Sequence, residues 1–398
     1  MKRSVPARLQ ITASAVTALA CVSLTACGSS SNSRSGSADS VITIGAPLGL
    51  SSSLSAIDKS ALVGIQLAVS QQNAKGGIKG HKIKLDVVDD AGTAEGSISA
   101  YEQLVTQHHA VGILGMVSTA ELSPISTTAI SRKQLVPIVG LAGPETIAKP
   151  GTTAYDWVYG DDINQNDVAP EQVENLVNDL HIKKIGVLYS TDPFGEGGLA
   201  AAKAEAAKLG ASIVASQPLS ATVSNMVAPL TALKNAGAQA ILPYFDGTPS
   251  ATLAFFNGRA TLNWYPPVEM SAVYLTIAGI TSSNSLAKNG YFYDTCNPLT
   301  PGFQAFQKET AKSLNFTGGG VVFAAADYVG AQVLFHAMSE ASDPSNPAQV
   351  NSALENQTKS FPSICGSGKV TLSPTQHSFN PVVPIYTNKN GTDDYLVK

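Results

Sequence analysis

The sequence has few charged residues and no strongly basic stretch in its body. Lysine and arginine number 25 and aspartate and glutamate 29, so charged residues make up 14% of the chain and the formal net charge is −4. Proteins that bind nucleic acids concentrate positive charge on one face, because contacts to phosphates supply much of their affinity. The composition therefore argues against a nucleic-acid partner and against a polybasic membrane-binding patch.

Long hydrophobic runs are missing after the N-terminal segment. A helix that spans a bilayer needs about 20 predominantly apolar residues. The nearest candidate, "GGGVVFAAADYVGAQVLFHAM" (318–338), is interrupted by glycines, Asp327 and His336. We interpret this stretch as a helix that is buried in the core of a folded domain.

Cysteine is scarce, with four residues in the chain. Cys21 and Cys27 lie in or directly after an N-terminal targeting segment, which leaves Cys296 and Cys365 as the thiols of the body. A bridge between them would close a loop of about 70 residues and contribute roughly 4 kcal/mol in the chain-entropy view. The alternative is two unpaired buried thiols, and the sequence leaves both possibilities open.

The first 26 residues are similar to a bacterial lipoprotein signal peptide. A basic start with Lys2, Arg3 and Arg8 precedes an apolar segment at 9–24, and the ending Leu24–Cys27 resembles a lipobox. The resemblance implies cleavage before Cys27 and attachment of diacylglycerol to its sulfur, so that the protein is anchored on the extracytoplasmic face of the cell membrane. Residues 27–40 would then form a Ser/Gly-rich tether with a reach of roughly 20 Å. The alternative is an ordinary secretory signal with a chance cysteine.

From Val41 onward, short β-branched runs alternate with helical patterns. Strands are predicted at 41–48, 82–90, 111–115, 136–140, 183–190, 212–217 and 240–245, and helices at 58–74, 95–108, 167–180, 196–209 and 225–236. Repeated strand–helix–strand order indicates parallel sheets that are covered by helices on both faces. The order occurs once before and once after "YDWVYGDDINQND" (155–167), so the sequence predicts an α/β protein with two doubly wound, Rossmann-like lobes.

Motifs of common enzyme classes do not occur in the sequence. It contains neither G-x-S-x-G nor H-E-x-x-H. "GEGGLA" (195–200) is not followed by the acid that would bind a ribose, and "GSGKV" (366–370) lacks the first glycine of a phosphate-binding loop. His108 and His109 have no partner at metal-ligand spacing. We therefore expect no catalytic activity, no cofactor and no metal site.

The stretch "NAKGGIKGHKIKLDVVDDAGTAEGS" (73–97) resembles the type I periplasmic solute-binding proteins of ABC importers, in the branch of the Leu/Ile/Val-binding proteins. Gly76, Gly77 and Gly80 match the turn of that family, and Asp89-Asp90 matches the end of its following strand. Further matches are "ITIGAPLGL", "ILGMVST", "VPIVGLAGP" and "IGVLYSTDPFGEG", in the expected order along the chain. The resemblance extends from about Val41 to Lys398.

The resemblance implies a monomeric receptor that captures a small molecule between two lobes by hinge closure and passes it to an ABC permease. It also implies three crossings between the lobes, which we place near 159–162, 291–296 and 364–368. The N-terminal lobe would then comprise 41–160 and 293–365, and the C-terminal lobe 161–292 and 366–398.

Candidate ligand-binding residues of the first lobe follow predicted strands. Ser118 and Thr119 precede a helix, where hydroxyl groups and the helix N-terminus could receive a carboxylate. The same residue types are favoured as helix caps, so capping is the alternative reading. The family commonly offers a carbonyl and a threonine hydroxyl to the ammonium group of the ligand, whereas this chain has Ala142 and Gly143 in that stretch.

Candidate residues of the second lobe are Phe194, Asp246 and Tyr274. Phe194 in "DPFGEG" occupies the position at which the family places an aromatic ring against the ligand, although it could equally pack its own loop. Asp246 could pair with an ammonium group, or it could be a turn residue before Gly247. Tyr274 follows a strand that lacks the acid found in the amino-acid binders of the family.

Three functional interpretations remain at this point. The first is a substrate-binding component of an ABC importer for branched-chain or related amino acids, or for a small carboxylate or aromatic compound. The second is a sensory receptor subunit with the same lobes. The third is an extracytoplasmic enzyme, which the missing catalytic motifs disfavour.

Overall fold

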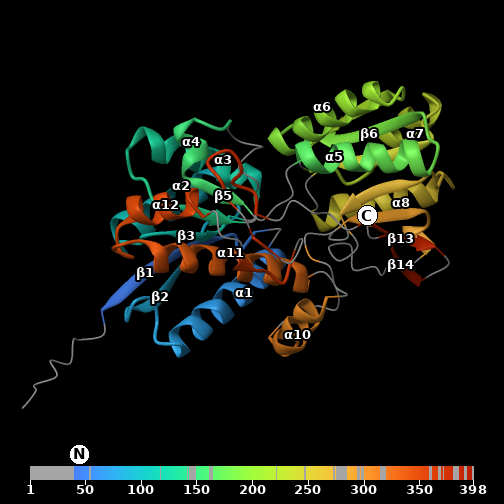
Figure 1. Ribbon diagram of the computed structural model, residues 1–398. Helices are drawn as coiled ribbons and strands as arrows, with labels where there is room; N and C mark the ends of the chain where they lie inside the picture. The colour runs from blue at the N-terminus through green and yellow to red at the C-terminus, as the bar shows by residue number, and fades with distance from the viewer. Residues whose placement is uncertain are drawn as a thin grey trace, which may run out of the picture. The chain divides into compact units, whose positions relative to one another are not determined.

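The computed structural model describes 40–52, 55–116, 118–140, 142, 149–160, 165–220, 222–245, 248–271, 274, 285–293, 296, 300–313, 320–357, 361–365, 369–370, 372–379, 385–389 and 392–396 (Figure 1). These residues form two α/β lobes, each built on its own mainly parallel sheet. The predicted fold class is confirmed. Nearly all the predicted strands and helices occur within a few residues of their expected bounds.

The first sheet is parallel, with the strand order β2-β1-β3-β4-β5. Its strands are β1 (Val41–Leu48), β2 (Lys82–Asp89), β3 (Ile113–Gly115), β4 (Ile138–Gly140) and β5 (Val158–Gly160). The helices of this lobe are α1 (Ser55–Ala74), α2 (Ala94–Thr106), α3 (Thr119–Ser131), α4 (Thr153–Asp156), α10 (Pro301–Thr310), α11 (Gly320–Glu340) and α12 (Pro347–Glu355). A short antiparallel pair, β11 (Phe361–Pro362) and β12 (Lys369–Val370), follows α12.

The second sheet has the strand order β14-β13-β10-β9-β8-β6-β7. Its strands are β6 (Lys184–Ser190), β7 (Ser212–Leu219), β8 (Ala240–Tyr244), β9 (Val268–Ser271), β10 (Gly290–Tyr293), β13 (Ile385–Lys389) and β14 (Thr392–Leu396). The other elements of this lobe are α5 (Gln165–Glu174), the π-helix η2 (Asn175–Asp179), α6 (Pro193–Lys208), α7 (Val227–Asn235), α8 (Pro249–Thr261) and the 3₁₀ helix η3 (Ser285–Ala287). Strand β13 is antiparallel to both of its neighbours, β10 and β14. The other neighbouring strands of this sheet are parallel to one another.

Alternate residues of each sheet pack into different cores, as the period of two along a strand requires. In β3, Ile113 joins the cluster that includes α2 and α3, whereas Leu114 joins the cluster that includes α1, α11 and α12. In β8, Leu242 packs with α5 and α6, whereas Ile241 packs with α7 and α8. Both sheets are therefore covered on both faces, which explains the continuous apolar runs in inner strands such as β3, β4 and β8.

The N-A-K-G-G turn at residues 73–77 has a structural role. The side chain of Asn73 accepts a hydrogen bond from the Ile83 N–H and donates one to the Ile83 carbonyl, each at 2.8 Å. It thus pairs with the outer edge of β2 as a further strand would. Gly77 has a φ of +81°, and a Cβ atom there would lie 2.0 Å from the His81 carbonyl oxygen. The motif joins α1 to the edge of the sheet.

Helix α11 is a core helix of the first lobe. Its segment Val321–Glu340 is long and apolar enough to cross a membrane by length and composition, but 83% of its most apolar window is buried in the protein. It packs closely on α1, since a Cβ atom at Gly64 would lie 1.8 Å from the Ala324 carbonyl oxygen. The interpretation of this stretch as a buried helix is confirmed for its described part, from residue 320 onward.

The connections between the two sheets start at β5, at the segment after β10 and at the segment after Phe379. Cys296 lies in the core of the first lobe, a few residues after β10 of the second. Val370, Leu372 and Phe379 also belong to the first core, whereas β13 pairs with β10. The third crossing therefore lies between Phe379 and Ile385 rather than near 364–368, because these three apolar side chains are buried with the first sheet.

Candidate functional site

The candidate site of the first lobe lies where its parallel strands end. In open α/β sheets, the loops after the carboxyl ends of the strands form the usual binding region. Here these loops follow Leu48, Asp89, Gly115 and Gly140. The described residues in them are held by local hydrogen bonds that fix the position of each functional group.

Ser118 caps helix α3. Its Oγ atom accepts a hydrogen bond from the Glu121 N–H at 3.3 Å, and its carbonyl accepts from the Leu122 N–H at 3.1 Å. Thr119 is the first residue of the helix and is 8% exposed. The capping role that the sequence allowed for this pair therefore belongs to Ser118, and Thr119 is the member of the pair whose hydroxyl is not needed as the cap.

Asp89 and Asp90 shape the loops around the end of β2. Asp89 Oδ1 accepts hydrogen bonds from the N–H groups of Ser51 and Ala91, at 3.3 and 3.0 Å. Asp90 Oδ1 accepts from the Gly92 N–H at 2.8 Å, and its Oδ2 accepts from the Ser97 hydroxyl at 3.3 Å. The pair thus connects the loop after β1 to the start of α2.

Three buried carboxyl groups, Asp58, Asp90 and Asp327, form what we call the carboxyl layer. Asp58 lies near the start of α1, Asp90 follows β2, and Asp327 lies in α11; each is at most 3% exposed. No hydrogen-bond partner among the described residues reaches either carboxylate oxygen of Asp58, or Oδ2 of Asp327. This layer could not be predicted from local sequence patterns, because its members are far apart in the chain.

The pKa values of the carboxyl layer are raised. Burial raises the pKa of Asp327 to about 8, and the charge of Asp58 adds to this effect. Burial likewise raises the pKa of Asp58 to about 6 against the opposing effect of the nearby Gly49 backbone, and the charge of Asp90 adds a smaller increase. The pKa of Asp90 is raised by burial, although the Gly92 N–H opposes the change. Asp327 is therefore mostly protonated at neutral pH.

Of the two candidate residues in the "GLAGP" stretch, Ala142 is the one that the structure describes. It is 1% exposed, and its N–H donates to the Met116 carbonyl at 3.1 Å. This hydrogen bond joins the loop after β4 to the loop after β3, close to Ser118 in the chain. Gly143 lies outside the described residues. The side chain of Ala142 offers a ligand only a methyl group.

Phe194 lies in the first turn of α6, which begins directly after the β6 loop. Asp192 caps this helix by accepting from the Gly195 N–H at 2.8 Å. A Cβ atom at Gly195 would lie 2.1 Å from the Ser190 carbonyl oxygen, so the D-P-F-G sequence allows α6 to start close to β6. Phe194 is half-buried against the core that includes α5 and α6, which leaves part of its ring accessible.

Tyr274 is buried in the second lobe. It is 5% exposed, its hydroxyl donates to the Phe245 carbonyl, and its ring meets the Phe245 ring edge-on at 5.2 Å. Its contacts are thus those of a core residue at the ends of β8 and β9.

Asp246 and Cys27 lie outside the described residues. A disulfide joins Cys296 to Cys365, which are 69 positions apart in the sequence, and both cysteines are buried in the first core.

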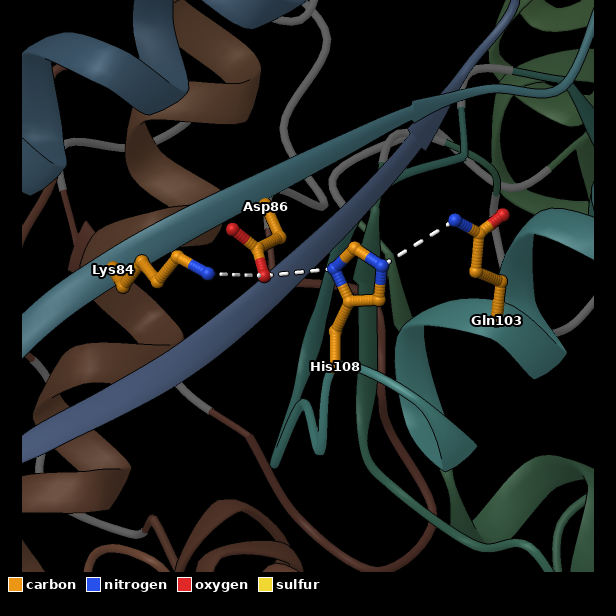
Figure 2. A network of polar contacts seen from close by, with 4 residues as sticks. All are labelled: Lys84, Asp86, Gln103 and His108. Carbon is orange, nitrogen blue, oxygen red and sulfur yellow. Dashed lines mark hydrogen bonds and ion pairs between the residues drawn. The ribbon is translucent and has the colours of Figure 1, made fainter.

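The histidine at 108 belongs to a polar cluster on β2 and α2 (Figure 2). Its Nδ1 atom lies 2.8 Å from Asp86 Oδ2, which also pairs with Lys84 Nζ at 2.9 Å, and its Nε2 faces Gln103. Burial raises the pKa of Asp86, but hydrogen bonds from Lys84 and His108 outweigh it and lower the pKa. The cluster fastens α2 to β2. Within the described part of the chain, no group of three or more acidic, cysteine or histidine side chains could hold a metal ion.

A comparison with known protein families identifies the family to which this chain belongs. The family model described as "Periplasmic binding protein" matches residues 41–392. This match covers both lobes, from the first residue of β1 to the first residue of β14. The chain belongs to the periplasmic binding protein family.

Curated relatives match part of the sequence, and solved structures match most of the chain in fold. A curated protein of Brucella melitensis, named "Leu/Ile/Val-binding protein homolog 3", is 30% identical over 206 residues, which are 52% of this chain and 54% of that protein. The chain thus spans about half the length of the curated relatives it matches. Among solved structures, a leucine-binding protein from Thermotoga maritima has a TM-score of 0.73 at 16% identity, with 89% of this chain and 98% of that one covered. A fatty acid ABC transporter substrate-binding protein from Thermomonospora curvata has a TM-score of 0.74 at 15% identity, with 90% and 93% covered.

Within this periplasmic binding protein, the described candidate residues divide into two kinds. Thr119 and the accessible part of Phe194 lie at the starts of helices that follow strands β3 and β6. Ser118, Ala142 and Tyr274 instead make the local contacts of a cap, a loop link and a core ring. Thr119 and Phe194 therefore remain the candidates for direct contact with a ligand.

Proposed function

We propose that this protein is the extracytoplasmic substrate-binding component of an ABC importer, and that it captures a branched-chain or related amino acid by closure of its two lobes. The observation that carries the proposal is the family match over 41–392, together with curated relatives named as amino-acid-binding proteins. The family is described by binding, and the loops after the strands offer hydroxyl and backbone N–H groups that suit the carboxylate of a ligand.

The carboxylate of the ligand would be received at the start of α3. This helix spans Thr119–Ser131, so its first N–H groups carry the partial positive charge of the helix dipole. The Thr119 hydroxyl would add one hydrogen bond to the charged carboxylate. Phe194 would contribute apolar contact from the second lobe.

A small carboxylate or aromatic compound is the alternative ligand. Two observations favour it over a plain α-amino acid. Ala142 has no hydroxyl to offer an ammonium group, and the Tyr274 hydroxyl already donates to the Phe245 carbonyl. One of the structural neighbours is a fatty acid ABC transporter substrate-binding protein, and a fatty acid is a carboxylate without an amino group.

Replacement of Thr119 tests the proposed carboxylate site. A thermal-shift screen with L-leucine, L-isoleucine, L-valine, small carboxylates and aromatic acids would first select a ligand, because binding to the folded state raises the melting temperature. In Thr119→Ala we expect affinity for that ligand to fall about tenfold, the usual effect of losing one charge-assisted hydrogen bond. Stability should change little, because Ser118 caps the helix.

Thr127→Ala is the matched control, because Thr127 lies in the same helix, is exposed and bonds only to carbonyls of its own turn. Titration calorimetry should show unchanged affinity in this variant. Equal affinities in all three proteins would rule out the start of α3 as the carboxylate site. If the ligand that raises the melting temperature most in the screen has no amino group, this result would favour the small carboxylate or aromatic compound.

We further propose that Cys27 carries the lipid that holds the protein at the membrane. In Cys27→Ser we expect the protein to appear in the soluble extracytoplasmic fraction, since the acylated sulfur is lost. Cell fractionation followed by immunoblotting measures this. Retention of the variant in the membrane fraction would contradict the lipid anchor, whereas Cys21→Ser, a change within the proposed signal peptide, should leave retention unchanged.

A further inference from the structure

A segment near the C-terminus extends the first sheet beyond its edge strand β5. The Gly160 N–H donates to the His377 carbonyl at 3.1 Å, and the Phe379 N–H donates to the Gly160 carbonyl at 3.1 Å. Gly160 and Ser378 form a parallel bridge. The segment 377–379 therefore runs beside the last residue of β5, in the same direction.

Two of the three connections between the sheets leave from this bridge. After Gly160, the next described element is α5, which packs on α6 of the second lobe. After Phe379, the next described element is β13, which pairs with β10 of the second sheet. Because Gly160 and Phe379 are hydrogen-bonded to each other, the two connections start side by side.

The side chain of His377 holds the bridge together from inside the first lobe. Its Nδ1 atom lies 2.9 Å from the carbonyl oxygens of both Tyr155 and Val158. Carbonyl oxygens only accept hydrogen bonds, so Nδ1 carries the proton and donates to both. The His377 ring is stacked between the rings of Tyr155 and Tyr159, with centroid distances of 4.2 and 4.3 Å.

The two tyrosines are themselves anchored. The Tyr155 hydroxyl accepts from the His377 N–H at 3.1 Å, and the Tyr159 hydroxyl lies 3.2 Å from Asn351 Oδ1 on α12. Asn351 Nδ2 in turn donates to the Asp156 carbonyl at 2.9 Å. All three rings are at most 1% exposed. The base of the two connections is thus fixed to β5 and to α12.

We propose that His377 is a positioning residue for the hinge: it fixes the point at which two of the three connections leave the first lobe. This inference rests on the proposed function, since a hinge matters only if the lobes close on a ligand. Histidine suits the role because it combines a ring that stacks between two tyrosines with an N–H donor. Phenylalanine offers only the first of these properties and glutamine only the second.

Hydrogen exchange in the ligand-free protein tests the local part of the proposal. In His377→Phe the stacking is kept but the donor is lost, so we expect the amides of Gly160 and Phe379 to exchange about tenfold faster than in the wild type. The exchange rates of the β1 amides should change only as far as the global stability of the protein changes. The matched control is Tyr101→Phe, which removes the hydrogen bond from a buried tyrosine of the same lobe to the Gln134 carbonyl, at 2.7 Å, and leaves β5 untouched.

Distances between spin labels test the hinge itself. Labels on Glu95→Cys in α2 and Lys203→Cys in α6, both exposed positions, report on the two lobes in an exported Cys27→Ser chain whose disulfide is intact. We expect a broader distance distribution for His377→Phe and an unchanged one for Tyr101→Phe. An equal distribution in all three proteins, or equal acceleration of Gly160 and Phe379 exchange by both variants, would overturn the proposal. These measurements need no ligand, so their failure is distinct from a failure to bind amino acids.

Discussion

Asp327→Asn should make the protein more stable at alkaline pH and remove much of the dependence of its stability on pH. Asp327 is 3% exposed, and burial raises its pKa to about 8, with an added contribution from the charge of Asp58. In the unfolded chain the pKa returns to about 3.9. The folded state therefore binds a proton more tightly than the unfolded state does. Asparagine has nearly the same shape and no charge.

The sign of the pH effect follows from this difference in proton binding. Stability falls with rising pH wherever the folded state holds more protons than the unfolded state. For Asp327 the fall begins above the unfolded pKa and levels off above about 8. Its slope is of order 1 kcal/mol per pH unit. Asp58, with a pKa of about 6, contributes in the lower part of the same range.

Denaturant titrations of the wild type and Asp327→Asn at pH 5, 7 and 8.5 measure the effect. We expect a small advantage for the variant at pH 5, which lies about one unit above the unfolded pKa, and an advantage of several kcal/mol at pH 8.5. The control is Asp343→Asn, because hydrogen bonds from Ser345 lower the pKa of this exposed aspartate, and that variant should gain nothing at high pH. A difference between wild type and Asp327→Asn that is the same at all three pH values would contradict the raised pKa.

The carboxyl layer shows what the sequence could and could not reveal. The alternation of strands and helices predicted both lobes, because the apolar period of each element is local information. The meeting of Asp58 with Asp327 depends on how α1 crosses α11, and these residues are 269 positions apart in the numbering of the chain. The sequence interpretation used Asp327 only as an interruption of an apolar run.

The third crossing between the lobes and the candidate site also depend on contacts that local sequence patterns do not reveal. Val370, Leu372 and Phe379 are too widely spaced to predict a strand, so nothing local indicated that they remain in the first core. Residue types at strand ends correctly marked a helix start at Ser118 and Thr119. They could not show that Ser118 provides the cap or that the Tyr274 hydroxyl is used by Phe245. His377 was missed because its role comes from stacking between residues more than 200 positions earlier.

Gly64→Ala should destabilise the first lobe by roughly 3 kcal/mol, the upper range for overpacking a core. The added Cβ atom would lie 1.8 Å from the Ala324 carbonyl oxygen and 2.7 Å from its carbon. Both are backbone atoms of α11, so no side-chain rotation relieves the clash and the two helices must move apart. Alanine is intrinsically better than glycine in a helix by about 1 kcal/mol, but this gain is smaller than the cost of separating α1 from α11.

Gly197→Ala supplies the matched control, because Gly197 lies within α6 and a Cβ atom there would meet no atom within 4 Å. This variant should be slightly more stable than the wild type, by about 0.5 kcal/mol. Denaturant unfolding of the three proteins measures both changes. A Gly64→Ala variant as stable as Gly197→Ala would show that α1 and α11 do not approach as closely as the structure has them.

The same substitution also probes the carboxyl layer, because Asp327 lies one helical turn after Ala324. A wider gap between α1 and α11 lets water reach Asp58 and Asp327, which reduces the burial that raises their pKa values. The stability of Gly64→Ala should therefore depend less on pH than that of the wild type between pH 5 and 8.5. If its pH dependence matched the wild type despite the lost stability, the raised pKa of Asp327 would not depend on the close crossing of the two helices.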